Sequence, residues 1–241
     1  MYGLVGKKLG HSFSKDYFTK KFSELNLDYS YQNIEIESIG DIIPFIKDNK
    51  NLKGFNVTVP YKEEIIPYLD ELDPVAEEVG AVNTVKIFDD GRLTGFNTDV
   101  IGFEKILEKT ERHKDAKTTS LIFGSGGASK AVQYVLNKKN IPYKIVSRSF
   151  KLGVISYEDV KSFEPYSIII NATPVGMFPN VNECLELPYS TIGPHNVFID
   201  LIYNPEETLF MKKARQNGAA AFNGLTMLHE QAEAAWEIWD S

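Results

Sequence analysis

The sequence predicts an α/β protein of two domains, because two series of short apolar runs alternate with segments of helical periodicity. The first series is typical of a mostly parallel α/β domain, with strands expected at residues 2–5, 29–34 and 54–57 and helices at 15–25 and 39–48. A polar stretch, residues 110–117, separates the two series. The second series has a Rossmann-like order, with strands expected at 119–123, 143–146, 167–171 and 197–201 and a helix at 129–139.

Three further segments complete the expected elements. Asp89-Asp90-Gly91 has the residues of a hairpin turn, and a helix is expected from Thr98-Asp99 to about Lys109. From Leu225 to Trp239 the apolar residues recur on one helical face, so this last helix is expected to pack against another element.

Composition restricts the partners of the protein. A length of 241 residues suits two modest domains, and a net charge of −7 argues against a nucleic acid as partner. The single cysteine, Cys184, cannot form an intrachain disulfide and suits the cytoplasm. The four histidines lack the short spacings of a metal site, so no metal is expected. No stretch has the pattern of a signal peptide or the length of a membrane span.

The turn Gly124-Ser125-Gly126-Gly127-Ala128 follows an apolar strand and opens a helix. Glycines at such a turn let backbone N–H groups approach a pyrophosphate at the N-terminus of the helix, so a bound dinucleotide is expected. Ser129 stands where the full G-x-G-x-x-G pattern has its last glycine, which keeps a purely structural tight turn as the alternative.

Ser147-Arg148-Ser149 lies at the end of the second strand of this domain, where NAD sites carry an acidic residue for the ribose 2′-hydroxyl. A carboxylate would repel a 2′-phosphate, whereas a guanidinium flanked by hydroxyls would bind it by charge-assisted hydrogen bonds. The expected cofactor is therefore NADP. An Arg148 that is simply solvated at the strand end is the alternative.

Polar residues in the first domain mark a second candidate site. The alternation in residues 56–62 places Asn56 and Thr58 on one face of a strand, with Lys62 in the following turn. This segment alone favours a solvated surface lysine. Asn83 lies in an apolar strand and Asp99 at the start of the linking helix, where an N-terminal helix charge is an equal alternative.

Ser12 and Ser14 offer two hydroxyls at positions i and i+2. On one side of an extended segment, both could donate to a carboxylate. Their spacing alone favours a different interpretation, in which Ser14 is the N-cap of the helix that follows.

Taken together and in order, seven segments resemble shikimate dehydrogenase over essentially the whole chain. They are Gly10-His11-Ser12-Phe13-Ser14, residues 56–62, Gly80-Ala81-Val82-Asn83-Thr84, Asn97-Thr98-Asp99, the glycine turn 124–128, Asn171-Ala172-Thr173-Pro174-Val175-Gly176-Met177, and Asp200-Leu201-Ile202-Tyr203-Asn204-Pro205. Each segment is a weak signal alone, and the signal is strong because all seven occur in this order. In this chain Lys15 stands where many relatives have proline.

The resemblance implies a role for each matching residue. It implies that Lys62 and Asp99 are the catalytic pair and that a small-molecule substrate, shikimate or 3-dehydroshikimate, binds in the first domain. The residues implied to bind the substrate carboxylate are Ser12, Ser14 and Tyr203, and those implied to meet its ring oxygens are Thr58, Asn83, Asp99 and Gln231. The implied neighbours of the nicotinamide are Thr173, Gly224 and Met227, and the phosphate loop is Gly124, Ser125, Gly126, Gly127 and Ala128.

The resemblance also implies the domain organisation. Family proteins return their last helix to the first domain, so residues 1–100 and 225–241 are expected to form the substrate-binding and catalytic domain. Residues 101–224 would be the Rossmann-like NADP-binding domain. A monomer or a homodimer is expected, with no nucleic-acid or membrane partner.

The residues fit this chemistry independently of the resemblance. Reduction of a ring ketone builds negative charge on its oxygen, which a positioned Lys62 ammonium can stabilise and protonate, while Asp99 keeps the lysine charged and aimed. Two alternatives share the fold: a quinate/shikimate dehydrogenase that also uses NAD, and a non-catalytic nucleotide-binding module. Loss of Lys62 or Asp99 would indicate the module, and both residues are present. A folate-linked dehydrogenase would leave Ser12 and Ser14 without a purpose.

Overall fold

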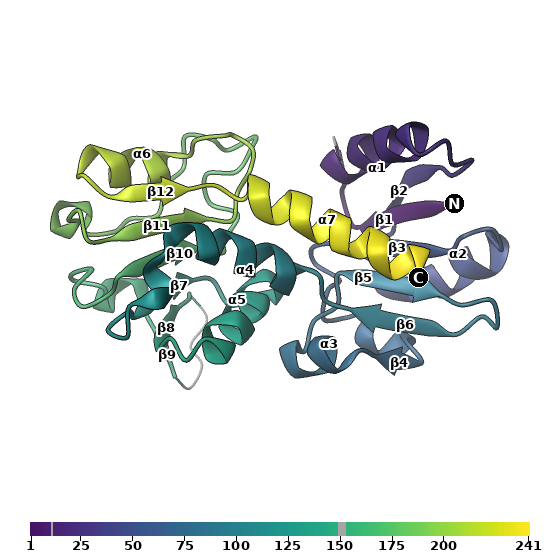
Figure 1. The fold of residues 1–241 in the computed structure, drawn as a ribbon, viewed down its shortest axis with the longest axis horizontal. Helices are drawn as coiled ribbons and strands as arrows, with labels where there is room; N and C mark the ends of the chain where they lie inside the picture. The colour runs from purple at the N-terminus through teal and green to yellow at the C-terminus, as the bar shows by residue number, and fades with distance from the viewer. Residues whose placement is uncertain (11, 149–152) are drawn as a thin grey trace. The chain divides into compact units, whose positions relative to one another are not determined.

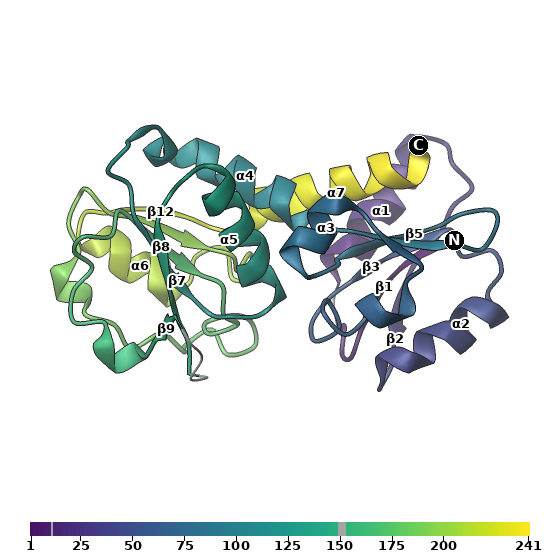
Figure 2. The same ribbon diagram turned by 90° about the horizontal axis from the view of Figure 1, so that it is seen from below.

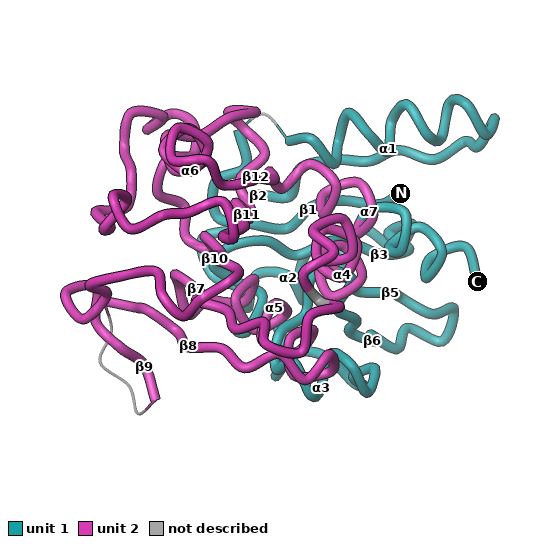
Figure 3. The backbone as a smooth tube through the Cα atoms, turned by 60° about the vertical axis from the view of Figure 1, so that its left-hand side comes forward, with its two compact units in different colours: residues 1–98, 232–241 teal, residues 99–231 magenta. Residues whose placement is uncertain are grey.

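The computed structural model describes residues 1–10, 12–148 and 153–241. They form two compact units, Met1–Thr98 with Ala232–Ser241, and Asp99–Gln231 (Figure 3). Each unit is built on one six-stranded sheet (Figure 1). No helix in these described ranges is both long and apolar enough to cross a membrane.

The sheet of the first unit has the strand order β2-β1-β3-β5-β6-β4. Its strands are β1 (Tyr2–Gly6), β2 (Tyr31–Glu35), β3 (Gly54–Val57), β4 (Glu71–Leu72), β5 (Thr84–Ile87) and β6 (Leu93–Phe96). β1 runs parallel to β2 and β3, and β4 runs parallel to β6, whereas β5 is antiparallel to both of its neighbours. The hairpin expected at Asp89-Asp90-Gly91 is thus confirmed as the connection between β5 and β6.

Helices cover both faces of this sheet. They are α1 (Phe13–Glu24), α2 (Ile42–Asp48), α3 (Pro74–Val79) and the second half of α7 (Leu225–Asp240). Ile34 and Phe55 pack with Ile42 of α2 on one face. Tyr2 and Tyr31 pack with α1 and with Trp236 and Trp239 of α7 on the other face. Figure 2 shows α1 and α7 on the side of the sheet opposite α2. Successive strand residues point to opposite faces, so β2 contributes Tyr31 and Ile34 to different clusters.

The expected packing partner of the last helix is therefore found within the first unit. The Trp239 indole stacks on Tyr2 with ring centroids 4.7 Å apart, and its Nε1 donates to the Val85 carbonyl at 3.0 Å. A Cβ at Gly54 would lie 2.4 Å from that Nε1, so only glycine lets the indole approach β3 this closely. Tyr17 and Lys21 of α1 both hydrogen-bond the Glu233 carboxylate of α7.

The second unit has the strand order β12-β11-β10-β7-β8-β9, and its strand pairs are parallel. Its strands are β7 (Ser120–Phe123), β8 (Tyr143–Val146), β9 (Val154–Ile155), β10 (Ile168–Asn171), β11 (Val197–Asp200) and β12 (Ala220–Phe222). Its helices are α4 (Asp99–Thr110), α5 (Gly127–Lys138) and α6 (Leu209–Gln216), with the first turns of α7. Counted from β7, this is the 3-2-1-4-5-6 order of a Rossmann domain, which confirms the predicted fold class.

Helices lie on both sides of this second sheet, with α5 and α6 on opposite sides (Figure 2). Leu121, Ile169 and Phe198 pack with Phe210 and Met211 of α6. The remaining short elements are 3₁₀ turns, at Ile39–Asp41, Ile66–Tyr68, Arg112–Lys114, Tyr157–Asp159 and Tyr189–Thr191.

Candidate active site

The predicted polar residues of the first unit lie at one edge of its sheet. Because β1 and β3 are parallel neighbours, Ser12 and Ser14 after β1 and Thr58 and Lys62 after β3 all follow the carboxyl ends of strands. The carboxyl edge is where open α/β sheets bind their ligands.

Asn83 and Thr98 reach this same edge from antiparallel strands. Asn83 immediately precedes β5, and its carbonyl accepts from the Val57 N–H at the end of β3, 2.8 Å away. Thr98 follows β6, whose last residue pairs with Thr84. The Asn83 side chain joins the start of β5 to the segment after β6. Its Nδ2 donates to Thr98 Oγ1 at 2.9 Å, and its Oδ1 accepts from the Thr98 N–H at 2.7 Å.

The structure corrects the expectation for the two serines. The helix begins at Phe13, two residues earlier than expected, and its N-cap is Ser12, whose Oγ accepts from the Lys15 N–H at 3.4 Å. Ser14 lies in the first turn, so the prediction of Ser14 as N-cap is wrong, and the two residues do not share one extended segment. Ser12 has the extended backbone, with φ −105° and ψ 115°, that an N-cap needs. Proline at position 15 has no N–H and could not make this bond.

Lys62 is half-buried in the turn that follows β3. Its carbonyl accepts from the Val82 N–H at 2.7 Å, which ties the turn to the segment before β5. The preceding Tyr61 is buried and donates its hydroxyl to the Ile36 carbonyl at 2.7 Å. These two contacts fix the backbone that carries Lys62, whereas the backbone of a lysine on an open surface loop would lack such contacts.

Asp99 is the first residue of α4 and is 5% exposed. A carboxylate is favoured there by the positive end of the helix dipole, which is the structural alternative considered for this residue. Burial to this degree is unusual for an aspartate that serves only as a surface helix charge.

The glycine turn of the second unit fits a dinucleotide. Gly124 has φ +108°, and a Cβ there would lie 2.8 Å from the Ala172 carbonyl oxygen, so this position requires glycine. Gly126 is the N-cap of α5, and a Cβ there would meet nothing within 4 Å. Open space therefore lies in front of a 12-residue helix N-terminus, where a pyrophosphate binds in Rossmann domains.

The end of β8 lies beside this turn. Ser147 follows β8, and its Oγ is 3.1 Å from the Oγ of Ser125. Arg148 is exposed. Burial raises the pKa of Tyr157, and the positive charge of Arg148 opposes that rise. The guanidinium is therefore near enough to the Tyr157 hydroxyl to act on it electrostatically. Ser149, the third residue expected to hold the 2′-phosphate, lies outside the described residues.

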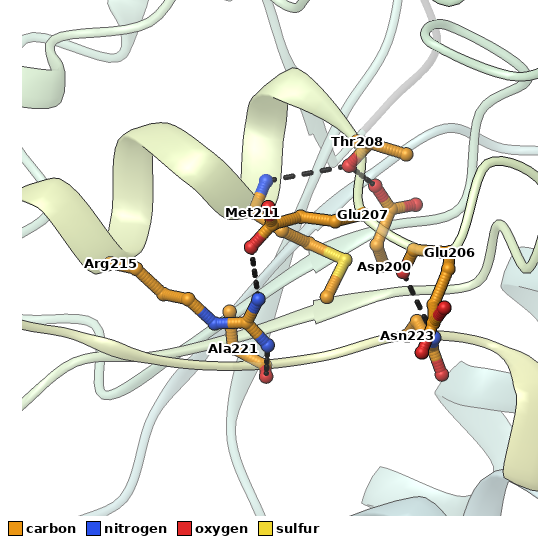
Figure 4. A network of polar contacts seen from close by, with 8 residues as sticks. All are labelled: Asp200, Glu206, Glu207, Thr208, Met211, Arg215, Ala221 and Asn223. Carbon is orange, nitrogen blue, oxygen red and sulfur yellow. Dashed lines mark hydrogen bonds and ion pairs between the residues drawn. The ribbon is translucent and has the colours of Figure 1, made fainter.

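A buried polar network, which sequence reasoning missed, connects the ends of β10 and β11. Asn171 Oδ1 accepts from the Thr173 Oγ1 at 2.6 Å and from its N–H at 3.0 Å. Asn171 Nδ2 donates to Asp200 Oδ1 at 3.1 Å. Thr208 Oγ1 donates to Asp200 Oδ2 at 2.6 Å, as Figure 4 shows. Burial raises the pKa of Asp200 to about 6, against the hydrogen bonds from Thr208, the Ile202 N–H and Asn171. Asn171 and Asp200 both belong to the seven segments that carry the family resemblance. A polar residue at the end of each of two apolar strands was the sequence signal from which this network could have been predicted.

The other predicted residues of the second unit follow β11 and β12. Tyr203 is partly exposed, and burial of the rest of its side chain raises its pKa. A Cβ at Gly224 would lie 2.1 Å from the Leu201 carbonyl oxygen, so the chain approaches too closely there for any other residue. Met227 packs on Gly102 of α4, where a Cβ would lie 2.5 Å from the Met227 carbonyl oxygen. Gln231 is buried, and its Nε2 donates to the Leu228 carbonyl at 3.0 Å.

A surface hollow of the second unit is lined by other residues. It has a volume of about 490 Å³ and lies between α6 and β12 (Figure 4). Arg215 lines it, forming an ion pair with Glu207 and donating to the Ala221 carbonyl at 2.9 Å. None of the predicted site residues lines the hollow. Among the described residues, no three His, Cys, Asp or Glu side chains are grouped so that they could hold a metal ion.

Comparison with known proteins finds shikimate dehydrogenases among the relatives of this chain. Residues 4–85 match the model of the shikimate dehydrogenase substrate-binding domain. A shikimate dehydrogenase (NADP+) of Clostridium perfringens is 35% identical over all of this chain and 92% of its own length. A crystal structure of a shikimate dehydrogenase in complex with NADP+ is 37% identical, with a TM-score of 0.85 over 99% of this chain and 88% of its own. The Listeria monocytogenes enzyme, solved with shikimate and NAD, is 31% identical, with a TM-score of 0.85 over 99% and 91%.

Proposed function

The chain belongs to the shikimate dehydrogenase family, and from this premise we propose how its own residues perform the reaction. It is an NADP-dependent oxidoreductase that interconverts 3-dehydroshikimate and shikimate in aromatic amino-acid biosynthesis. The observation that supports this assignment to residues is the convergence of Ser14, Thr58, Lys62 and Asn83 on the carboxyl edge of one sheet. We propose that residues 1–100 and 225–241 form the substrate-binding and catalytic domain and that residues 101–224 bind the dinucleotide.

Lys62 is the proposed acid and base of the reaction. When NADPH is bound, its nicotinamide supplies a hydride to the carbonyl carbon. The Lys62 ammonium stabilises the negative charge that grows on the carbonyl oxygen and then protonates it. In the reverse direction the neutral lysine accepts the proton of the shikimate hydroxyl. Asp99 is the second member of the proposed catalytic pair. The fixed backbone around Lys62 supports the role of the lysine as acid and base, because an acid must be held within hydrogen-bond reach of the reacting oxygen.

The substrate contacts are proposed from side-chain chemistry. Ser12, Ser14 and Tyr203 donate hydroxyls to the carboxylate. The residues proposed to meet the ring oxygens are Thr58, Asn83, Asp99 and Gln231. Burial of both serines supports a role in recognition, because a hydrogen bond to a charged group is stronger where water is excluded.

The cofactor contacts follow the strand ends of the second unit. Residues 124–128 hold the pyrophosphate, and the open space before Gly126 supports this placement. Ser147, Arg148 and Ser149 bind the 2′-phosphate. Thr173, Gly224 and Met227 lie beside the nicotinamide, and the close approaches at Gly224 and Met227 keep that backbone in one arrangement.

The remaining proposals concern the state of the protein in the cell. Each proposed catalytic group comes from one chain, so a monomer suffices for the chemistry, and a homodimer is compatible with it. The single cysteine supports a reducing compartment, and we propose the cytoplasm.

The test is to measure initial rates of shikimate and quinate oxidation, each with NADP and with NAD, by the absorbance of the reduced cofactor. We expect kcat/KM to be highest for shikimate with NADP. Comparable values for quinate, or for NAD, would favour the broader quinate/shikimate dehydrogenase, for which the NAD complex of the Listeria relative is a precedent. Activity with none of the four combinations would overturn the proposed function.

A further inference from the structure

A fully buried pair of side chains, Asn171 and Asp200, lies at the carboxyl edge of the sheet in the second unit. The two residues end the parallel neighbours β10 and β11 in register, and both are 0% exposed. Asn171 Nδ2 donates to Asp200 Oδ1 at 3.1 Å. Apolar residues would join the two strands without the cost of burying an amide and a carboxylate, so strand pairing alone does not account for this pair.

Asn171 fixes Thr173, one of the proposed neighbours of the nicotinamide. The Asn171 Oδ1 accepts from the Thr173 N–H at 3.0 Å and from the Thr173 hydroxyl at 2.6 Å. Because a backbone N–H can only donate, the amide oxygen must face Thr173, and the hydroxyl gives its proton to that oxygen. The Thr173 oxygen accepts from the Val175 N–H at 3.3 Å, so toward a ligand it can only accept. The ribose hydroxyls and the carboxamide N–H groups of a nicotinamide nucleoside are donors that suit such an acceptor.

Thr173 also lies beside the glycine turn that is proposed to hold the pyrophosphate. A Cβ at Gly124 would lie 3.2 Å from Thr173 Cγ2 and 2.8 Å from the Ala172 carbonyl oxygen. The Ala172 N–H donates to the Phe123 carbonyl at 2.8 Å, which ties the segment after β10 to the end of β7. The hydroxyl that Asn171 orients is therefore next to the segment that a dinucleotide would contact.

Asp200 fixes Gly224, another proposed neighbour of the nicotinamide, through the backbone. Asp200 Oδ1 accepts from the Ile202 N–H at 3.1 Å, and the Ile202 carbonyl accepts from the Gly224 N–H at 2.9 Å. The Leu201 N–H donates to the Asn171 carbonyl at 3.0 Å. The segment after β11 is thus held by both members of the buried pair, and it holds Gly224 in turn.

We propose that Asn171 and Asp200 are positioning residues that hold Thr173 and Gly224 beside the nicotinamide half of the cofactor. This inference rests on the proposed function, in which Thr173 and Gly224 are neighbours of the nicotinamide. Neither Asn171 nor Asp200 touches the reacting atoms. Their effect concerns the nicotinamide nucleoside, because the residues proposed for the phosphates follow other strands, β7 and β8.

The test compares Asn171→Ala with the wild type in two measurements. The first is kcat/KM for NADP at saturating shikimate. The second is the inhibition constant of adenosine 2′,5′-bisphosphate, which competes with NADP and lacks the nicotinamide nucleoside. The kcat/KM for NADP should fall about 10- to 100-fold, the scale of a displaced reacting group, whereas the inhibition constant should stay within about twofold. An equal weakening in both measurements would overturn the proposal, because the whole cofactor site would then have changed.

Asn196→Ala is the matched control. Asn196 is also 0% exposed and lies just before β11, and its amide accepts from the Gly193 N–H at 2.8 Å and donates to the Tyr166 carbonyl at 2.7 Å. Its removal should lower the melting temperature and leave both kinetic measurements within about twofold of the wild type. If Asn171→Ala shows that same pattern, the buried pair is only structural and the proposal is overturned. A comparable loss of kcat/KM in both variants would also overturn it, because the loss would then follow from stability.

Thr173→Val distinguishes failure of this inference from failure of the proposed cofactor contact. It removes the hydroxyl that Asn171 orients and should lower kcat/KM for NADP about 5- to 10-fold, on the scale of one lost neutral hydrogen bond. If Thr173→Val has this effect and Asn171→Ala has none, the positioning role is wrong and the contact stands. If Thr173→Val has no effect, the contact is wrong and the positioning proposal is overturned with it.

Two further variants complete the test. In the Asn171→Ala background, Thr173→Val should add less than about twofold, because the two changes remove one path of contact, and full additivity would contradict the proposal. Asn171→Ser takes the place of Asn171→Ala if the alanine variant does not fold. The single hydroxyl of serine cannot bridge Thr173 and Asp200, so the same loss in kcat/KM for NADP is expected with an unchanged inhibition constant.

Discussion

Asp200 gives the second unit a pH-dependent stability that Asp200→Asn should remove. Burial raises the pKa of this carboxyl from 3.8 to about 6. Between those values the unfolded carboxyl releases its proton while the folded one keeps it, so the folded state binds more protons and stability falls as pH rises. The decrease is complete above the folded pKa.

The magnitude follows from the two pKa values. A raised pKa of this size corresponds to about 3 kcal/mol at full ionisation, of which about 2 kcal/mol develops between pH 4.5 and 7.5. The asparagine side chain of the variant cannot ionise. The free energy of unfolding of Asp200→Asn, measured relative to that of the wild type, should therefore rise by about 2 kcal/mol between pH 4.5 and 7.5. The amide still offers an acceptor to the Ile202 N–H and a donor toward Thr208, so the fold should survive.

The assay is urea unfolding at several pH values, followed by far-UV circular dichroism because both tryptophans, Trp236 and Trp239, lie in the first unit. Glu206→Gln is the matched control, because this side chain is exposed and its loss of charge should leave the pH profile of the wild type unchanged. Parallel profiles for Asp200→Asn and the wild type would refute the argument from burial.

Three further variants test separate parts of the protein. The double variant Ser12→Ala and Ser14→Ala should mainly raise the KM for shikimate, and it should lose about 1 kcal/mol of stability because the Ser12 cap is removed. Steady-state kinetics and thermal unfolding check this, and a loss of stability with an unchanged KM would leave only the capping role. Arg148→Ala should raise the NADP KM about 10- to 100-fold and leave that for NAD nearly unchanged, since a hydrogen bond to a charged group contributes about 1.5–3 kcal/mol. Steady-state kinetics with both cofactors checks this, and equal losses would make Arg148 structural. Trp239→Ala should cost about 3–5 kcal/mol in urea unfolding, because it empties a packed aromatic site and frees the Val85 carbonyl; an unchanged midpoint would contradict the docking of α7.

The sequence predicted four of the parallel strands of the second unit, β7, β8, β10 and β11, because they are continuous apolar runs between turns. Shorter elements were missed, among them β9, β12 and α6. α3 is six residues long and has almost no period, although Asp73-Pro74 caps its start and Gly80, with φ +66°, ends it. The start of α1 was placed too late because Ser12 and Ser14 both fit an N-cap, and only the backbone geometry of Ser12 decides between them.

The polar residues of the candidate site were predictable from their places after strands, whereas their connections were not. Tyr31 and Asn56 meet because β1 lies between β2 and β3, and no local pattern gives that strand order. Asn171 and Asp200 meet for a similar reason, since β10 and β11 pair in the register that sets these two residues side by side. Register is decided by tertiary packing, so hydrogen bonds across strands are visible only in the folded structure.

The turnover of Lys62→Ala tests the central claim most directly. Shikimate oxidation with saturating NADP should lose about 100-fold or more in kcat, the usual scale for a general acid and base, while circular dichroism and the melting temperature stay close to those of the wild type. Lys50→Ala, at an exposed lysine, is the control and should retain full activity. A Lys62→Ala enzyme that is folded and turns over shikimate at the wild-type rate would contradict the account.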